Sequence, residues 1–390
     1  MSSENLTRTN ALLTVGSLEN LHRRTSTKWR EFPAEVLPMH VAEMDYEIAL
    51  RIREKLASMI AGSDTGYLGP MPELALSMAG FAKARWNWEI DTESVFTATD
   101  VGVGMIEMAR MIVKPGDGIV YNTPVYHNIG NWIDELRCPR VDAPLKRDGL
   151  RYTLDFDAIE SAYKGGAKLH FLCNPANPVG TIFSREELSQ LAELAAQYGV
   201  AIFSDEIHAP LTYKEHTFVP FLSVSDTARE VGICVTSASK SWNLAGLKCA
   251  QIVTASLKWR EVALSMPPAV RWRSSLFGAA AGTIAYQSTA WLDQAVETND
   301  NNRHFLKRIL DEKLPQVGYR IPDFSYLAWL DLTSLELGQD PFQRLLEEAK
   351  VAFNSGAAFC ASHTQFVRFN FGTSESNIEE AVTRIGRLLG

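Results

Sequence analysis

Short apolar runs alternate with amphipathic helical stretches from about residue 50 onward, and this alternation constrains the fold more than any other feature. Five runs predict buried strands: residues 119–121, 169–172, 200–203, 233–236 and 250–253. A helix is predicted over residues 184–197, because Ser184 and Glu187 have the spacing of a capping box and Gly199 fits a helix stop. Strand, helix and strand in this order favour an α/β fold with helices on both faces of a parallel sheet.

The pattern changes after about residue 280. A long helical region is followed by strand-like segments at 326–332 and 366–371 and by helices near 341–349 and 375–389. A chain of 390 residues has room for two domains. We therefore predict a large domain over residues 49–285 and a smaller α+β domain over residues 286–390. Residues 1–48 are too few for a domain, and we expect them to join the small domain or to contact a neighbouring subunit.

Composition excludes several classes of protein. The 38 basic and 46 acidic residues give a net charge of −8 without a basic cluster, so we expect no nucleic-acid partner. No apolar run approaches the length of a membrane span, and residues 1–16 lack the features of a secretory signal. The five cysteines are scattered without a Cys-x-x-Cys pair, which argues against a disulfide framework or a metal site. Cytoplasm is the expected compartment, with no membrane partner.

Polar residues follow three of the predicted strands. In an open parallel sheet, ligands bind beyond the carboxyl ends of the strands. The side chains expected at this edge are an amide, a carboxylate with a nearby imidazole, and a lysine flanked by hydroxyls: Asn174, Asp205, His208, Ser237, Ser239 and Lys240.

These side chains suit one cofactor. Asp205 at the end of a buried strand would be costly to ionise without a cation, which a protonated pyridine nitrogen would supply. The Lys240 amine can form a Schiff base with an aldehyde, and Ser237 and Ser239 can donate hydrogen bonds to a phosphate. Together they indicate pyridoxal 5′-phosphate.

Three motifs carry a resemblance to a known family. They are Asn-Pro-Ala-Asn-Pro-Val-Gly at 174–180, Asp-Glu-Ile-His at 205–208 and Ser-Ala-Ser-Lys-Ser-Trp-Asn-Leu-Ala-Gly-Leu at 237–247. With further matching segments at 37–46, 114–117, 124–126 and 366–370, the chain resembles the fold-type I pyridoxal-phosphate enzymes. Within them it is most similar to the MalY/PatB branch of carbon–sulfur β-lyases, next to the class I/II aminotransferases. The resemblance implies a large domain with a mostly parallel seven-stranded sheet between helices, a smaller α+β domain, and a homodimer with shared active sites.

The resemblance also implies roles around the cofactor ring. Lys240 would hold the cofactor aldehyde and, once released, would move the substrate Cα proton. Asp205 would keep the pyridine nitrogen protonated. Tyr126 would stack on the ring opposite the lysine, as a third catalytic residue. Asn174 and His208 would face the 3-oxygen of the ring.

Further residues are implied for the cofactor phosphate. Val101 and Gly102 precede a helix expected over residues 105–113, and backbone amides at a helix N-terminus bind phosphate. Lys248 lies where aminotransferases often place a phosphate-binding arginine. Tyr67 matches a tyrosine that reaches the phosphate of the partner subunit.

Substrate binding is implied for Arg368, whose guanidinium can hold an α-carboxylate bidentately, together with Ala42 and Asn174. Two positions depart from the family. His40 replaces a usual tryptophan, and residues 359–363 replace a glycine-richer loop. We expect both to border the pocket for the substrate side chain.

The implied reaction is α,β-elimination from L-cystathionine or a related S-substituted L-cysteine, which yields a thiol, pyruvate and ammonia. The thiol from cystathionine is homocysteine. The same residues also permit a class I/II aminotransferase, and an alternative of another class is a regulatory protein that retains the cofactor site. The proton donor to the leaving sulfur stays open between Tyr126 and water.

Overall fold

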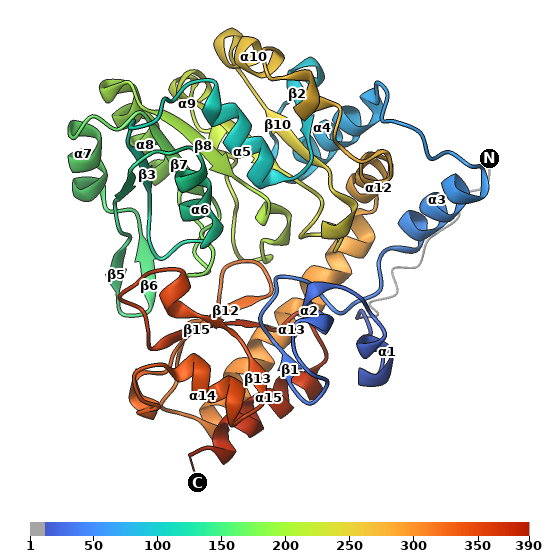
Figure 1. The fold of residues 1–390 in the computed structure, drawn as a ribbon, viewed down its shortest axis with the longest axis vertical. Coiled ribbons are helices and arrows are strands. Elements are labelled where there is room, and N and C mark those ends of the chain that lie inside the picture. The colour runs from blue at the N-terminus through green and yellow to red at the C-terminus, as the bar shows by residue number, and fades with distance from the viewer. Residues whose placement is uncertain (1–11, 390) are drawn as a thin grey trace.

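The structure, a computed structural model, describes residues 12–389, so the first eleven residues of the predicted N-terminal segment lie outside it. Its main feature is a seven-stranded sheet (Figure 1). In spatial order the strands are β2 (Val95–Ala98), β10 (Ala250–Val253), β9 (Gly232–Thr236), β8 (Ala201–Asp205), β7 (Leu169–Cys173), β3 (Ile119–Tyr121) and β4 (Arg140–Asp142). Strand β10 is antiparallel to both of its neighbours, and the other pairs are parallel. The predicted mostly parallel sheet is confirmed.

The strands of this sheet are buried on both faces. On β8, Ile202 packs into one hydrophobic cluster and Phe203 into the other, as alternation along a strand requires. Helices α5 (Val101–Arg110), α6 (Asn128–Glu135) and α10 (Leu257–Leu264) contribute to the cluster with Phe203. The opposite cluster is formed with α4 (Pro72–Trp86), α7 (Phe156–Lys164), α8 (Arg185–Tyr198), α9 (Asp226–Val231) and α12 (Leu276–Gln287). Helix α3 (Leu50–Ala61) packs against α12, and a short helix, α11 (Pro268–Arg271), lies beside β2.

Two helix starts follow from side-chain caps. At α8 the Ser184 hydroxyl accepts from the Glu187 amide at 3.1 Å, and the Glu187 carboxylate accepts from the Ser184 amide at 2.8 Å. This confirms the predicted capping box. Helix α5 begins four residues before its predicted start, because the Asp100 carboxylate accepts from the Val103 amide at 2.9 Å and caps the helix at that point.

A smaller antiparallel sheet lies below the large one in Figure 1, in the order β11 (Gly318–Tyr319), β12 (Leu327–Asp331), β15 (Phe366–Asn370) and β14 (Asn354–Ser355). The helices of this part are α13 (Thr289–Lys313), α14 (Pro341–Glu347) and α15 (Glu375–Arg387). A hairpin of β5 (Lys146–Asp148) and β6 (Arg151–Thr153) extends from the large sheet toward it. The domain boundaries at residues 48 and 285 stay a prediction.

The N-terminal segment lies across the smaller sheet, next to the C-terminal strands (Figure 1). It contains α1 (Leu18–His22), α2 (Thr27–Arg30) and β1 (Leu37–Pro38), and β1 pairs in parallel with β13 (Val351–Ala352). The carbonyl of Met39 also accepts from the amide of Asn370 at 2.8 Å. No helix within residues 12–389 combines the length and apolarity that a bilayer crossing requires.

Candidate active site

The carboxyl ends of β7, β8 and β9 open into a cavity of about 550 Å³, as expected for adjacent parallel strands. Ten of the predicted site residues line it: Ala42, Val101, Gly102, Tyr126, Asp205, His208, Ser239, Lys240, Lys248 and Arg368. Three do not. Asn174 and Ser237 are buried beside the cavity, and Tyr67 is 90% exposed on the surface of the chain. Residues more than 300 positions apart therefore meet in one place.

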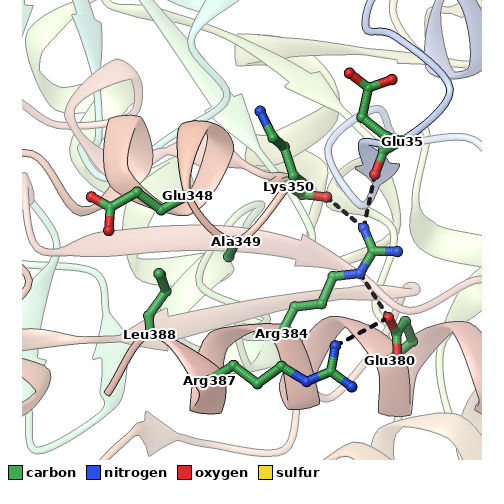
Figure 2. Close-up of a pocket in the computed structure, with 8 residues that line it drawn as sticks. All are labelled: Glu35, Glu348, Ala349, Lys350, Glu380, Arg384, Arg387 and Leu388. Atoms are coloured by element: carbon green, nitrogen blue, oxygen red, sulfur yellow. Dashed lines mark hydrogen bonds and ion pairs between the residues drawn. The ribbon is translucent and has the colours of Figure 1, made fainter. Parts of the chain in front are cut away.

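A second pocket, of about 410 Å³, lies at the C-terminal helix and has different chemistry. Figure 2 shows that the Arg384 guanidinium in it is already engaged by the carbonyls of Glu35 and Lys350 and by the Glu380 carboxylate. Its charges thus largely satisfy one another. The cavity at the strand ends is the candidate active site.

Lys240 follows β9, and its amine donates a hydrogen bond to the carbonyl of Ala42 at 2.9 Å. Burial lowers the pKa of Lys240 to about 8, and the nearby positive charge of Arg368 acts in the same direction. A sizeable fraction of this amine is therefore unprotonated near neutral pH. It can act as a nucleophile or a base.

Asp205 is the last residue of β8 and is 5% exposed. Burial raises its pKa to about 6, although the Ile207 amide at 3.1 Å and the charge of Lys240 oppose this shift. Within residues 12–389 no cation lies at ion-pair distance from this carboxylate. A cationic ring nitrogen inside the cavity would complete the pairing that a buried carboxylate requires.

One end of the cavity suits a phosphate. Val101 and Gly102 open helix α5, whose first-turn amides carry a partial positive charge. Lys248 reaches the same end and pairs with Asp100 at 3.1 Å. The Ser239 hydroxyl lines the cavity, whereas the Ser237 hydroxyl is 2.6 Å from the Cys249 carbonyl and accepts from the Ser239 amide. Ser237 is thus placed to orient Ser239 rather than to contact a ligand.

Two of the residues predicted to contact the cofactor ring, Tyr126 and His208, line the cavity. Tyr126 lines the cavity, and its hydroxyl oxygen accepts from the Asn128 amide at 2.6 Å. His208 also lines it and meets the Ser325 hydroxyl at 3.1 Å. Burial, together with the charges of Lys240 and Arg368, lowers the pKa of His208 well below its usual value, so the ring is neutral.

Asn174 is held behind the cavity wall by a residue that sequence reasoning missed. Its side-chain amide is 3.5 Å from the Glu206 carboxylate and 3.4 Å from the Val219 carbonyl, and its buried oxygen has no partner. Burial raises the pKa of Glu206 to about 7, while hydrogen bonds from the Phe221 amide and the Ser204 hydroxyl oppose the shift. A buried acid directly after a strand-end Asp is the signal that could have identified it.

Arg368 lies in β15, 2% exposed, where its guanidinium donates to Asn177 at 3.2 Å and to Asn354 at 2.7 Å. The Phe359 ring lies 4.9 Å from the guanidinium carbon. Burial lowers the pKa of Arg368 to about 10, so it stays cationic at neutral pH. A fixed, planar cation on this wall can bind a carboxylate bidentately. The sequence offered no signal for Asn354, which comes from a separate strand.

The two departures from the family lie differently from expectation. His40 lines the cavity, as predicted, and its Nε2 is 3.0 Å from the Glu31 carboxylate. The loop at residues 359–363 does not line the cavity, so that expectation was wrong. The loop instead contacts a residue that lines the cavity, because the Phe359 ring packs against the Arg368 guanidinium.

Comparison with known proteins shows the family to which this chain belongs. Residues 34–385 match the family model described as aminotransferase class I and II. The chain belongs to this family. Among its relatives, a Corynebacterium glutamicum protein named cystathionine β-lyase is 36% identical and aligns over 95% of this chain and 99% of its own length. The Bacillus subtilis protein named cystathionine β-lyase PatB is 30% identical, over 90% of this chain and 92% of its own.

Among solved structures, cystalysin from Treponema denticola, which contains pyridoxal 5′-phosphate, superposes on this member of the class I and II aminotransferase family with a TM-score of 0.91. It is 26% identical, and the match covers 97% of this chain and 98% of that one. Pyridoxal 5′-phosphate is also the cofactor that the sequence indicates for this cavity. The cavity fits it on its own chemistry: an unpaired buried carboxylate at Asp205, an amine at Lys240, and a helix N-terminus at Val101 and Gly102.

Proposed function

We propose that this chain is a pyridoxal-phosphate-dependent carbon–sulfur β-lyase. It performs α,β-elimination on L-cystathionine or a related S-substituted L-cysteine and releases a thiol, pyruvate and ammonia. The observation that carries the proposal is the shared cavity of the Lys240 amine, the unpaired Asp205 carboxylate and the Arg368 guanidinium. Relatives named cystathionine β-lyase over nearly the full chain favour elimination over transamination.

The cofactor would be held along the length of the cavity. Asp205 would pair with the ring nitrogen, Tyr126 would cover one ring face, and His208 would border the ring. Ser239, Lys248 and the first amides of α5 would bind the phosphate, with Val101 and Gly102 as the contact residues, while Ser237 would orient Ser239. Asn174 would reach the ring 3-oxygen after a small shift of its side chain toward the cavity.

When bound, the cofactor supplies a positively charged ring that accepts electrons from the substrate Cα. Arg368 binds the α-carboxylate, with Asn177 and Asn354 holding the guanidinium plane in position. Lys240 takes the Cα proton, because its lowered pKa leaves a neutral amine available. The carbonyl of Ala42 holds that amine at 2.9 Å. The electron pair that the proton leaves on Cα then forms a Cα–Cβ double bond, and the Cβ–S bond breaks to release the thiolate.

The leaving sulfur needs a proton. Tyr126 is the candidate donor, since its oxygen accepts from Asn128 and its own hydroxyl hydrogen stays free. Burial raises the pKa of Tyr126, so the hydroxyl is protonated at neutral pH. A water molecule would serve where the leaving group lies beyond its reach.

The test is pyruvate release by the purified, cofactor-loaded protein from L-cystathionine and from a panel of S-substituted cysteines. We expect pyruvate and thiol in equal amounts, and none from Lys240→Ala. Glutamate formed from 2-oxoglutarate faster than pyruvate would instead establish an aminotransferase. Bound cofactor without turnover of any thioether would favour the regulatory alternative.

We also propose a cytoplasmic homodimer in which Tyr67 reaches the partner's phosphate site. Tyr67 is 90% exposed in the connection between α3 and α4, and these two helices carry the exposed apolar side chains Leu50, Ile60 and Leu76. The cysteines are unpaired, which supports a reducing compartment.

Mixing the inactive variants Tyr67→Ala and Lys240→Ala tests the shared site. Each heterodimer would contain one site with both native residues, so activity should return. If Tyr67 served its own chain, mixing would restore nothing.

A further inference from the structure

Six charged side chains line the cavity: Glu31, Asp100, Asp205, Lys240, Lys248 and Arg368. Five have a partner or a task. Lys248 pairs with Asp100, and the proposed function uses Lys240, Asp205 and Arg368. Glu31 alone is left without a role.

Glu31 lies directly after α2 and lines the cavity. Its position is defined through His40, whose ring Nε2 is 3.0 Å from the Glu31 carboxylate and whose backbone carbonyl accepts from Arg368 at 3.2 Å. Glu31 and Arg368 thus both contact His40, Glu31 at its ring and Arg368 at its backbone carbonyl. Because both line one cavity of about 550 Å³, the Cβ substituent of a substrate whose α-carboxylate binds Arg368 can extend toward Glu31.

The negative charge of Glu31 is not balanced within the protein. Among residues 12–389, His40 is its only partner at ion-pair distance. Burial lowers the pKa of His40, and the charges of Lys28 and Arg368 add to this against the opposing effect of Glu31. A neutral His40 donates its Nε2 hydrogen to Glu31, while its Nδ1 stays buried without a partner. Because 46% of the Glu31 side chain is exposed, the carboxylate remains available to a ligand.

We propose that Glu31 determines specificity by binding an ammonium group on the leaving half of the thioether. The preferred substrates would then be thioethers with a distal amino group, such as L-cystathionine, over those with a neutral or purely anionic leaving group. This inference rests on the proposed β-elimination. Beyond that function, it specifies which thioethers the active site prefers.

The test compares kcat/KM for two substrates that differ only in the distal amino group, L-cystathionine and S-(3-carboxypropyl)-L-cysteine. We expect the native protein to prefer cystathionine by about tenfold, the size of a well-placed but partly exposed ion pair. Glu31→Gln should remove this preference by lowering kcat/KM for cystathionine alone. Glu31→Lys should reverse it, since the distal carboxylate is then attracted. Added salt should weaken the native preference.

Glu35→Gln is the matched control, because Glu35 is a nearby exposed carboxylate that lines the other pocket (Figure 2). It should leave the preference unchanged. If Glu31→Gln changes both substrates equally, Glu31 acts only through the position of His40 and the proposal is overturned. An unchanged preference with continuing pyruvate release would overturn it as well, while the proposed function stands.

Failure of the proposed function would be recognised separately, as absence of pyruvate from both substrates. Calorimetric titration with 2,7-diaminosuberic acid and 2-aminosuberic acid, which carry no leaving group, then decides the role of Glu31. Tighter binding of the diamino compound that disappears in Glu31→Gln supports the proposal. Equal binding of the two compounds by the native protein overturns it.

Discussion

The amine of Lys240 donates to the carbonyl of Ala42, which precedes it by 198 residues. The same carbonyl accepts from the Tyr326 hydroxyl at 3.0 Å. The N-terminal segment therefore contacts the residue on which the chemistry depends. Within the segment, a buried ion pair joins Lys28 to Asp45 at 2.9 Å, and Lys28 also donates to the Glu43 carbonyl at 3.1 Å. The amide of Asp45 donates to the Gly372 carbonyl at 2.8 Å, so this pair fixes a residue that anchors the segment to the C-terminal part of the chain.

Lys28→Met should destabilise the protein by about 3 kcal/mol, because the buried Asp45 carboxylate would lose its near cation and keep only the more distant Arg24 at 3.9 Å. Pyruvate release should fall as well, since the segment that carries Ala42 loses its anchor. Urea unfolding and kcat/KM measure the two effects. Lys83→Met is the control: its pair with Glu89 is exposed, so its loss should change the free energy of unfolding little. Equal effects of the two substitutions would contradict the anchoring role.

Asp205→Asn should stabilise the cofactor-free protein at pH 7 while it abolishes most activity. Folding raises the pKa of Asp205 from 3.8 to about 6, so the folded state binds this proton more tightly than the unfolded state. Asp205 therefore adds about 3 kcal/mol to the free energy of unfolding below pH 4, and this contribution is lost as the pH rises to 6. Urea unfolding of both cofactor-free proteins from pH 4 to 7 should show the curves diverging in this window. Parallel curves would show that the pKa of Asp205 is not raised in the folded protein.

Arg368→Lys should raise KM for the thioether about 10- to 100-fold. An ammonium keeps the charge, but it cannot bind a carboxylate bidentately or keep both contacts with Asn177 and Asn354. The absorbance of the bound cofactor should not change. Arg344→Lys, at an exposed pair with Glu348, should leave KM as it is. A native KM for Arg368→Lys would place the α-carboxylate elsewhere.

Gly102→Ala should weaken cofactor affinity by about tenfold. An added Cβ would lie 2.9 Å from the Trp132 ring, so either the first turn of α5 or this ring, which also lines the cavity, has to move. Absorbance titration of the cofactor-free protein with pyridoxal phosphate measures the loss. Gly80→Ala on α4 has open space around it and should instead stabilise the protein by about 0.5–1 kcal/mol. Native affinity in Gly102→Ala would argue against the phosphate site at α5.

Local sequence patterns predicted much of the large sheet. The runs that became β3, β7, β8, β9 and β10 were recognisable because buried strands are continuously apolar. Strand β4 was missed because it lies at the sheet edge, where Arg140 and Asp142 are exposed and no apolar run forms. The start of α5 was missed because one Asp100 side chain moves it by a full turn.

In the candidate site, too, some residues could be predicted from local sequence and others could not. Asp205 and Lys240 could be predicted because Asp205 ends one buried strand and Lys240 comes shortly after another, so their positions depend on neighbouring residues and on the general geometry of parallel sheets. The bonds of Arg368 to Asn354 and to the His40 carbonyl, and the position of Glu31, could not. These contacts join strands and segments that nothing in the local pattern relates.

By itself, the sequence determined the alternating strands and helices, the cofactor chemistry and the edge of the sheet where that chemistry lies. These properties follow from periodicity and from residue types within a few positions of each other. Only the tertiary structure decided that Lys240 donates to the Ala42 carbonyl, that Glu31 lines the cavity and that Asn354 holds the Arg368 guanidinium. The physical reason is that such contacts form when separate packed units dock, and their partners are selected by the shape and burial of whole surfaces rather than by any local pattern.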